Sequence, residues 1–158
     1  MRKFAANYLI SDTGVFLKNG MVLVGENGLI ARYIDTKGDL NEVEQLIFHN
    51  GILMADCMFT KTNANQAVSD SGKPFHSLVL QAVAGSTKIT IQHLLDLYKH
   101  LQLQFPELII PAMMNKISEI LIVEGGFIKE TISGIYLLSN VDLVDMHFKP
   151  NSRLKKIL

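Results

Sequence analysis

Several features are scarce in this chain of 158 residues, and each scarcity excludes a class of protein. The single cysteine, Cys57, cannot form an intramolecular disulfide, so the sequence gives no indication of an oxidising compartment. Fifteen Lys and Arg residues balance fifteen Asp and Glu residues, so no net charge attracts the chain to nucleic acid or to an anionic membrane. No apolar run approaches the roughly 18 residues of a membrane-spanning helix. A complete (β/α)₈ barrel is also excluded, because it needs at least about 200 residues.

What the chain does contain is enough apolar sequence for one compact domain. Hydrophobic residues make up 48% of it and charged residues only 19%, a balance that excludes disorder and permits a substantial core. The first twelve residues carry two basic side chains and an apolar stretch, but Asn7 and Asp12 interrupt that stretch and no cleavage pattern follows. We therefore expect a cytoplasmic protein.

The first third of the chain has the pattern of a β-sheet. Short apolar runs alternate with turn residues, and the turns include the Asn-Gly pairs at 19–20 and 27–28. Both residue types tolerate a positive φ, which the tight turn of a β-hairpin requires. The pattern predicts strands at Phe4–Ile10, Val15–Leu17, Met21–Val24 and Leu29–Ile34, then Gln45–His49 and Gly51–Ala55 around a third Asn-Gly turn.

The middle of the chain changes to loop and then to helical character. Phe59–Pro74 is rich in small polar residues without a period, which predicts a loop, and His76–Ala84 fits a short helix or a strand. From Lys88 onward the pattern is helical, with Ser86 or Thr87 as the candidate N-cap. The apolar residues at helical spacing are Ile91, Leu94, Leu95, Tyr98 and Leu101.

A second helix follows the first after Phe105-Pro106, where the first helix must end. Pro111 fits the first turn of this second helix, because the missing N–H has no intrahelical partner there, and Gly125-Gly126 ends it. Its apolar stripe, expected to face the core, is Met113, Met114, Ile117, Ile120 and Leu121. Strand patterns return at Ile135–Leu138 and Ser152–Leu158.

This order of elements predicts an α+β fold in a single domain spanning residues 1–158. We expect a small β-sandwich built from N- and C-terminal strands, with two to three helices from the middle of the chain. In this prediction residues 1–58 and 134–158 supply the sandwich strands, 59–87 form a loop-rich connection, and 88–124 form a helical pair.

Both ends of the chain resemble the amidohydrolase superfamily, especially its cytosine/guanine deaminase and chlorohydrolase-like branch. The resemblance is carried by Leu-Lys-Asn-Gly-Met-Val-Leu-Val at 17–24, Asn-Gly-Leu-Ile at 27–30, Phe-His-Asn-Gly-Ile-Leu-Met-Ala at 48–55, Gln-Phe-Pro-Glu-Leu at 104–108, and the segments 134–143 and 152–157. In that family the two chain ends build a small β-sandwich beside a metal-bearing barrel. The resemblance thus implies the composite β-sandwich part.

The chain departs from the family where the metal should bind. The positions that correspond to the family's His-x-His metal ligands hold Lys61 and Asn63. A lysine ammonium has no lone pair for a metal and repels the cation, and an Asn amide is a weak ligand for zinc-type metals. Only about two dozen residues separate Asn63 from Lys88, where the family has a barrel of roughly 250 residues. We expect the catalytic barrel to be missing, with no catalytic residue, metal or other cofactor.

A rebuilt metal site is the alternative. His93, Asp96 and His100 have the i, i+3 and i+7 spacing of one helix face, and with a further ligand such as His76 they could bind a metal ion. The contrary interpretation is that this face lies opposite the apolar stripe and is simply solvated. Cys57 is interpreted as a small core residue, because Asp56 beside it disfavours the thiolate.

Our leading hypothesis is a non-catalytic, amidohydrolase-like remnant that acts as a binding or assembly module. Loss of a barrel would expose an apolar face, so we expect a homodimer, with a full-length amidohydrolase relative as a possible further partner and neither nucleic acid nor membrane as one. The alternative is a metal-dependent hydrolase or deaminase that uses the rebuilt His/Asp site. A decayed gene product without a selected activity is a third possibility.

Overall fold

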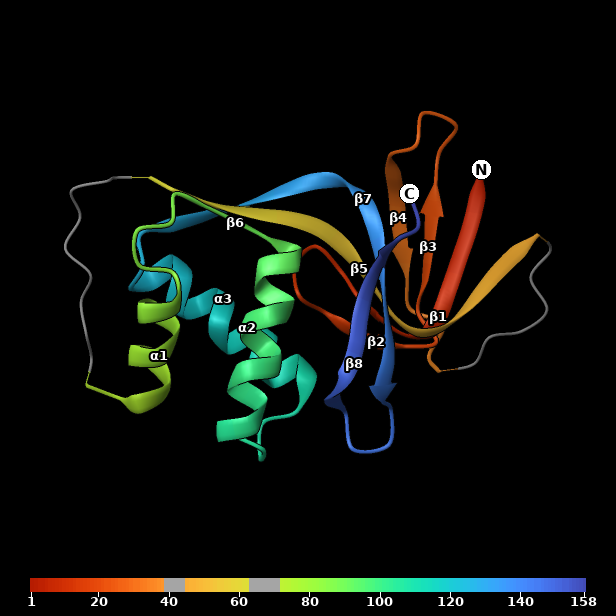
Figure 1. Ribbon diagram of the computed structural model, residues 1–158. Coiled ribbons are helices and arrows are strands. Elements are labelled where there is room, and N and C mark those ends of the chain that lie inside the picture. The colour runs from red at the N-terminus through yellow and green to blue at the C-terminus, as the bar shows by residue number, and fades with distance from the viewer. Residues whose placement is uncertain (39–44, 63–71) are drawn as a thin grey trace.

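The computed structural model describes residues 1–38, 45–62 and 72–158. Eight strands and three helices are found in these residues (Figure 1). In chain order they are β1 (Arg2–Ile10), β2 (Phe16–Lys18), β3 (Met21–Val24), β4 (Ile30–Ile34), β5 (Leu46–Lys61), α1 (Pro74–Ala82), β6 (Lys88–Thr90), α2 (Ile91–Gln104), α3 (Ile110–Val123), β7 (Phe127–Asp142) and β8 (His147–Lys156).

The strands form one mixed sheet that joins the two ends of the chain. Its order is β4-β3-β1-β5-β7-β8, with β2 paired to β1 and β6 paired to β5. The β1–β5 pairing is parallel, whereas the other pairings among the described strands are antiparallel. N-terminal and C-terminal strands thus share one sheet, and the middle of the chain supplies the helices. The predicted α+β class is confirmed.

The Asn-Gly pair at 50–51 forms a bulge inside β5, and the prediction of a hairpin turn there was wrong. Between Ala6 and Tyr8 the β1–β5 register shifts, because β5 advances three residues where β1 advances two. Gly51 has a φ of +133° and its N–H donates a hydrogen bond to Asn7 Oδ1 at 2.7 Å. A tight turn and a bulge both favour glycine at a positive φ, and here the pairing with β1 continues through the bulge.

The long strands extend beyond their predicted limits. β5 continues through Phe59 to Lys61, which the sequence pattern had assigned to a loop, because these residues pair with β7. β7 covers 16 residues around the predicted Ile135–Leu138, and β8 begins at His147, before the predicted Ser152. The predicted loop residues 63–71 lie outside the described residues.

The helices begin and end close to their predicted positions, with one correction at the start of α2. Its N-cap is Thr90, whose Oγ1 accepts a hydrogen bond from the N–H of His93, and neither Ser86 nor Thr87 has this role. The reason is a tertiary contact: residues 88–90 pair with β5 as strand β6, so they cannot belong to the helix. The ambiguous segment after Pro74 is helical as α1. Pro111 lies in the first turn of α3, as predicted.

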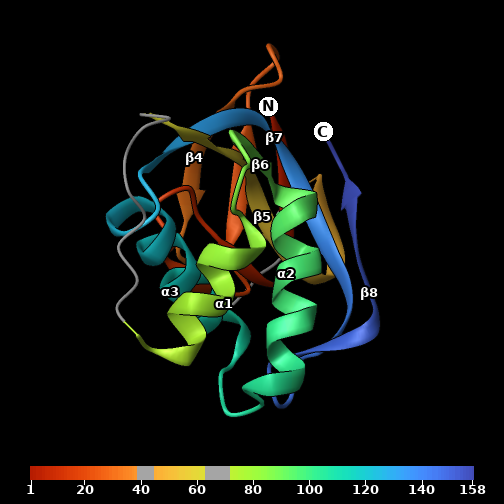
Figure 2. The ribbon, with the colours of Figure 1, turned by 60° about the vertical axis from the view of Figure 1, so that its left-hand side comes forward.

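The helices cover one face of the β5–β7 half of the sheet, as Figure 2 shows. The largest cluster of buried side chains lies between these layers and contains both predicted apolar stripes, except for half-buried Met114. From the sheet it includes Ile52, Met54, Phe59 and Leu138. Packing of amphipathic helices against a sheet is the expected way to remove both apolar faces from water.

A second cluster fills the inside of the other half of the sheet. Its buried members are Phe4, Ala6, Leu9, Val22, Val24, Leu53, Ile135 and Leu137. Ile30 and Tyr33 of the edge strand β4 pack against this cluster, and so do Ile157 and Leu158, which directly follow the opposite edge strand β8. Both edges can reach one cluster only because the sheet rolls toward itself. The small sandwich of terminal strands is therefore formed by one continuous, rolled sheet.

The described helices are too short to cross a bilayer. The longest, α2 and α3, have 14 residues each, whereas a spanning helix needs about 20. The cytoplasmic location stays a prediction.

Candidate functional site

The residues of the alternative metal site lie on an exposed face of α2. His93, Asp96 and His100 border an open surface groove of about 380 Å³ between α1, β6 and α2. His93 also takes part in the helix cap, since its Nδ1 accepts a hydrogen bond from the N–H of Thr90 at 3.3 Å. His100 Nε2 lies 3.3 Å from Gln104 Nε2, one turn further along α2.

His76 does not join these residues. It projects from α1 toward α3, where its Nδ1 lies 2.9 Å from a carboxylate oxygen of Glu124. Within residues 1–38, 45–62 and 72–158, no group of three or more His, Cys, Asp or Glu side chains is arranged to hold a metal ion. Lys61 ends β5 opposite Phe127, and Asn63 lies outside the described residues.

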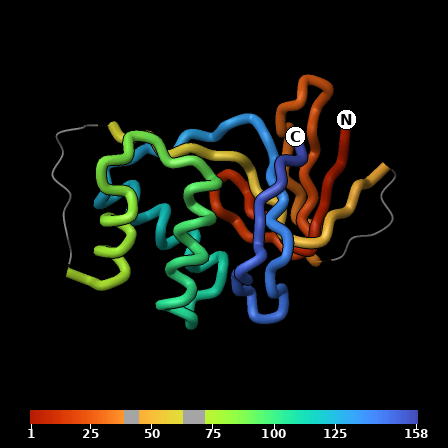
Figure 3. The backbone as a smooth tube through the Cα atoms, in the orientation of Figure 1, coloured from red at the N-terminus to blue at the C-terminus, as the bar shows by residue number. Residues whose placement is uncertain are grey.

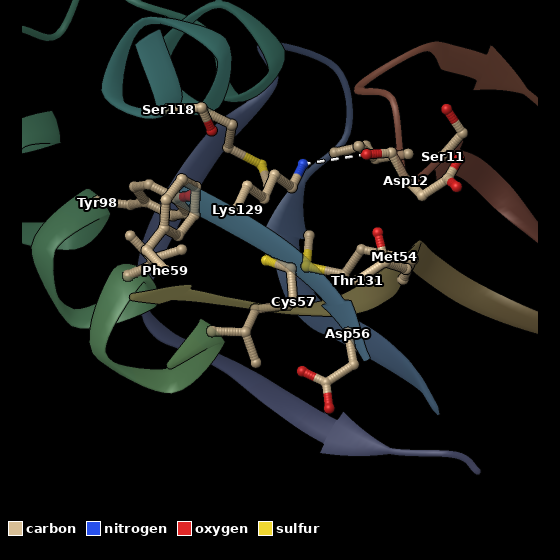
Figure 4. A pocket seen from close by; sticks show the side chains of 15 residues that line it. Ser11, Asp12, Met54, Asp56, Cys57, Phe59, Tyr98, Ser118, Lys129 and Thr131 are labelled. Carbon is tan, nitrogen blue, oxygen red and sulfur yellow. Dashed lines mark hydrogen bonds between the residues drawn. The ribbon is translucent and has the colours of Figure 1, made fainter. Parts of the chain in front are cut away.

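A small, partly open pocket lies instead between the sheet and the helices (Figure 4). Its volume is about 30 Å³, and its walls come from β5, β7, α2, α3 and the loop that follows β1. The polar groups that line it include Cys57 of β5, Tyr98 of α2, Ser118 of α3 and Lys129 of β7. These four residues are distant in the sequence, so only the packing of the layers brings them together.

Local structure fixes the cationic side chain of the pocket. The loop after β1 is closed by Ser11, whose N–H donates to the Val15 carbonyl at 2.9 Å and whose Oγ accepts from the Val15 N–H at 3.1 Å. This loop presents the backbone carbonyl of Asp12, to which Lys129 Nζ donates a hydrogen bond at 3.1 Å. Figure 4 shows this contact at the side of the pocket. The ammonium is thus held at the pocket wall.

Tyr98 is the most deeply buried polar side chain of the pocket. It is 3% exposed, and its ring stacks on Phe148 with a centroid distance of 5.6 Å. Burial, together with the neighbouring Cys57, raises the pKa of its hydroxyl far above the ordinary value. The hydroxyl points toward the pocket interior (Figure 4) and makes no hydrogen bond to another residue in the described part of the chain.

Cys57 is a protonated thiol in this environment. Burial raises its pKa above the ordinary value, the Lys129 ammonium lowers it, and the Asp56 carboxylate raises it further. The thiolate is the nucleophilic form of cysteine, so this environment does not activate the residue. Cys57 was expected to be a core residue, and it is partly buried at the edge of the main cluster and lines the pocket.

The size of the pocket limits what it can hold. A volume of about 30 Å³ has room for about two water molecules, whereas pockets for organic ligands measure roughly 300–1,000 Å³. The pocket can therefore hold a small polar ligand but not an organic substrate. Sequence reasoning missed it, because Tyr98 belongs to an ordinary apolar stripe and Lys129 has no motif around it.

A second candidate site is a strand segment at the other end of β5. Residues 46–50, which we call the β5 edge segment, pair with β1 on one side. The β5–β7 pairing begins only at Ile52, so no described strand pairs with the other side of this segment. Figure 3 shows the segment at the margin of the molecule beside β1. Its side chains Ile47 and Phe48 are 46% and 44% exposed.

Comparisons with protein-family models, curated proteins and solved structures gave no match. The structure itself defines the class of fold, which is α+β with a rolled mixed sheet. The resemblance to amidohydrolases stays a prediction.

Proposed function

We propose that this chain is a non-catalytic assembly module that forms a homodimer by pairing the β5 edge segments of two copies. The observation that carries the proposal is a strand segment with one side that no described strand pairs with, and with two exposed apolar side chains. An unpaired strand side offers N–H and C=O groups to a further strand. An origin as an amidohydrolase remnant is compatible with this function but is not needed for it.

The charges on the sheet edges support self-pairing at this segment. The edge strand β8 carries Arg153, Lys155 and Lys156, side chains of the kind that discourage edge-to-edge association. β4, β2 and β6 each contain a Lys or Arg as well. The β5 edge segment, Leu-Ile-Phe-His-Asn, contains no Asp, Glu, Lys or Arg. The chain thus protects its other edges by charge and leaves this one unprotected.

A second copy fits this edge better than an unrelated charged partner. In an antiparallel pair related by a twofold axis, the same segment meets itself, so any formal charge would face its own copy. An uncharged segment avoids that repulsion. The formal net charge of zero also means that no long-range repulsion separates two copies. Ile47 and Phe48 alternate along the strand and would add apolar contacts on both faces of the joined sheet.

The experiment places a charge on the segment. Phe48→Lys should convert the dimer to a monomer in size-exclusion chromatography with light scattering, because the twofold axis brings two ammonium groups together. We expect the dimer dissociation constant to increase at least about tenfold, which corresponds to about 1.4 kcal/mol.

The matched control is Ile122→Lys on α3, where the replaced side chain is 45% exposed and distant from the segment in sequence and element. This variant should remain dimeric. A monomeric wild-type protein at high concentration, or equal dissociation of both variants, would contradict the proposal.

A further inference from the structure

The β5 edge segment contains one ionisable side chain, that of His49. Its register partner on β1 is Ala6, and its imidazole stacks on the ring of Phe4 with a centroid distance of 6.3 Å and an interplanar angle of 18°. Phe4 and Ala6 belong to the cluster inside the rolled sheet. The imidazole of His49 is therefore half-buried against an apolar surface, on a segment that forms the margin of the sheet.

The Nε2 atom of His49 is buried and has no hydrogen-bond partner among the described residues. A neutral imidazole has one N–H donor and one acceptor nitrogen, whereas an imidazolium has two N–H donors. With its proton on Nδ1, the neutral ring leaves only an unpaired acceptor at Nε2. A proton on Nε2 adds a charge and a donor, which are far more costly to bury without an acceptor. Protonation therefore requires Nε2 to leave this position and reach water.

The charged groups that face His49 supply no acceptor. On β1, the strand against which His49 stacks, the Cζ atom of Arg2 lies 5.9 Å from the centroid of the Phe4 ring, whereas Lys3 alternates to the opposite face. β1, β3 and the β5 edge segment contain no Asp or Glu. Tyr33 of β4 packs against the same cluster, and because burial raises its pKa to about 12 its hydroxyl is uncharged. An imidazolium would thus meet a cation and no carboxylate.

Pairing of two copies would close the route by which the ring reaches water. In one copy, no described strand pairs with the outer side of the segment, so the imidazole can turn outward there. This step rests on the proposed function: in an antiparallel pair with Phe48 on the twofold axis, His49 lies opposite Ile47 of the partner subunit. The two imidazoles then become diagonal neighbours, roughly 7–8 Å apart. Two protonated rings would therefore be desolvated and would repel each other.

We propose that His49 makes the dimer sensitive to acid, so that protonation of its imidazole separates the two copies. Assembly and proton binding oppose each other, and each weakens the other by the same factor. Histidine is the side chain that ordinarily changes its charge between about pH 5 and 8. The edge strands β2, β4, β6 and β8 carry Lys or Arg. His49 gives the β5 edge segment the same protection by charge, but only in acid.

The test measures the dimer dissociation constant by sedimentation velocity at pH 7.5 and pH 5.5, at constant ionic strength. Carboxylates with ordinary pKa values, near about 4, stay ionised over this interval. The dissociation constant of the wild type should increase at least about tenfold at pH 5.5, because each dimer takes up protons as it separates. His49→Gln keeps a polar side chain that does not titrate, so this variant should remain dimeric at both pH values.

His100→Gln is the matched control, because His100 is exposed on α2 and lies outside β5. This variant should separate in acid as the wild type does. A wild-type dimer that is unaffected at pH 5.5, or an equal acid response of wild type and His49→Gln, would overturn this proposal and leave the proposed dimer intact. A wild-type monomer at pH 7.5 would overturn the proposed function and this inference with it.

An NMR titration of the His49 imidazole in the wild type gives a readout that needs no variant, and it decides the question if His49→Gln does not dimerise. The ring should take up its proton at a lower pH in a concentrated, dimeric sample than in a dilute, monomeric one. Identical titrations in the two samples would show that assembly does not oppose protonation, and the proposal would fail.

Discussion

At the scale of single residues, this protein places two tyrosine side chains and its one cysteine where burial favours their neutral forms. Tyr33, Tyr98 and Cys57 all have raised pKa values, and burial is the largest cause for each. The desolvated phenolate or thiolate is the costly form in such an environment. These side chains are therefore uncharged at neutral pH, and their contribution to stability depends on pH at the alkaline end.

Tyr33 provides a measurable consequence. Burial, with a further contribution from Asp12, raises its pKa from 10.0 to about 12. In the unfolded chain this hydroxyl loses its proton near pH 10, while the folded protein retains it until about pH 12. The stabilisation is therefore complete below pH 10 and is lost as the pH rises toward 12. Tyr33→Phe should show a smaller loss of unfolding free energy over this interval in urea titrations.

The tyrosinate absorbance of the folded protein gives an independent check. The difference between wild type and Tyr33→Phe should contain one titration near pH 12, because only the wild type has this hydroxyl. A difference spectrum that titrates near pH 10 would show that Tyr33 is not protected by the fold.

At the scale of elements, β5 is the strand that connects most parts of the architecture. It pairs with β1, β6 and β7, contributes to both main clusters, lines the pocket and carries the edge segment. The bulge at Gly51 divides these roles: among the described strands, the residues before it pair with β1 alone, and those soon after it pair with β7 as well.

Gly51→Ala should test this bulge. A Cβ at this position would collide with the Leu138 carbonyl oxygen, and the backbone φ is +133°. We expect a loss of about 2–4 kcal/mol of unfolding free energy, because strain and a contact with backbone combine. Denaturant unfolding of the variant measures it.

Gly28→Ala is the control for strain alone. Gly28 has a φ of +80°, but a Cβ there meets nothing within 4 Å. Gly28→Ala should lower the unfolding free energy by about 1–2 kcal/mol, because alanine must adopt the left-handed conformation there. Equal losses for the two variants would show that the close approach at Gly51 is relieved at no cost.

At the scale of the whole molecule, the two main clusters share β5 and β7, so they should unfold together. Leu53 and Ile117, both fully buried, belong to the rolled sheet and to the helical layer, respectively. Leu53→Ala and Ile117→Ala should each lower the unfolding free energy by about 2–5 kcal/mol within one transition. Denaturant unfolding curves give the loss of free energy, and curves that coincide for far-UV circular dichroism and tyrosine fluorescence would show the single transition.

A two-step curve in either variant would contradict the prediction of a single domain. It would instead indicate that the rolled sheet and the helical layer are separate cooperative units.

Much of the fold could be predicted because it depends on local patterns. Met21–Val24 is a strand with the predicted limits, and Pro111 lies in the first turn of α3 as expected. One error arises at Asn50-Gly51, because a hairpin turn and a β-bulge both favour glycine at a positive φ. Another arises at the start of α2, because the pairing of β6 with β5 makes Thr90 the first position at which the helix can be capped. The pocket could not be predicted, because Tyr98 and Lys129 come together only through the packing of α2 against β5 and β7.

By itself, the sequence determined the α+β class, the helix faces and most strand positions, because hydrophobic period and turn residues act over a few neighbours. The tertiary structure decided the roll of the sheet, the bulge in β5, the pocket and the unpaired edge, because these depend on contacts between residues far apart in the chain. Uncharged residues such as Tyr98 and Phe48 come to line a pocket or to stand exposed on a strand only through the neighbours that the fold gives them.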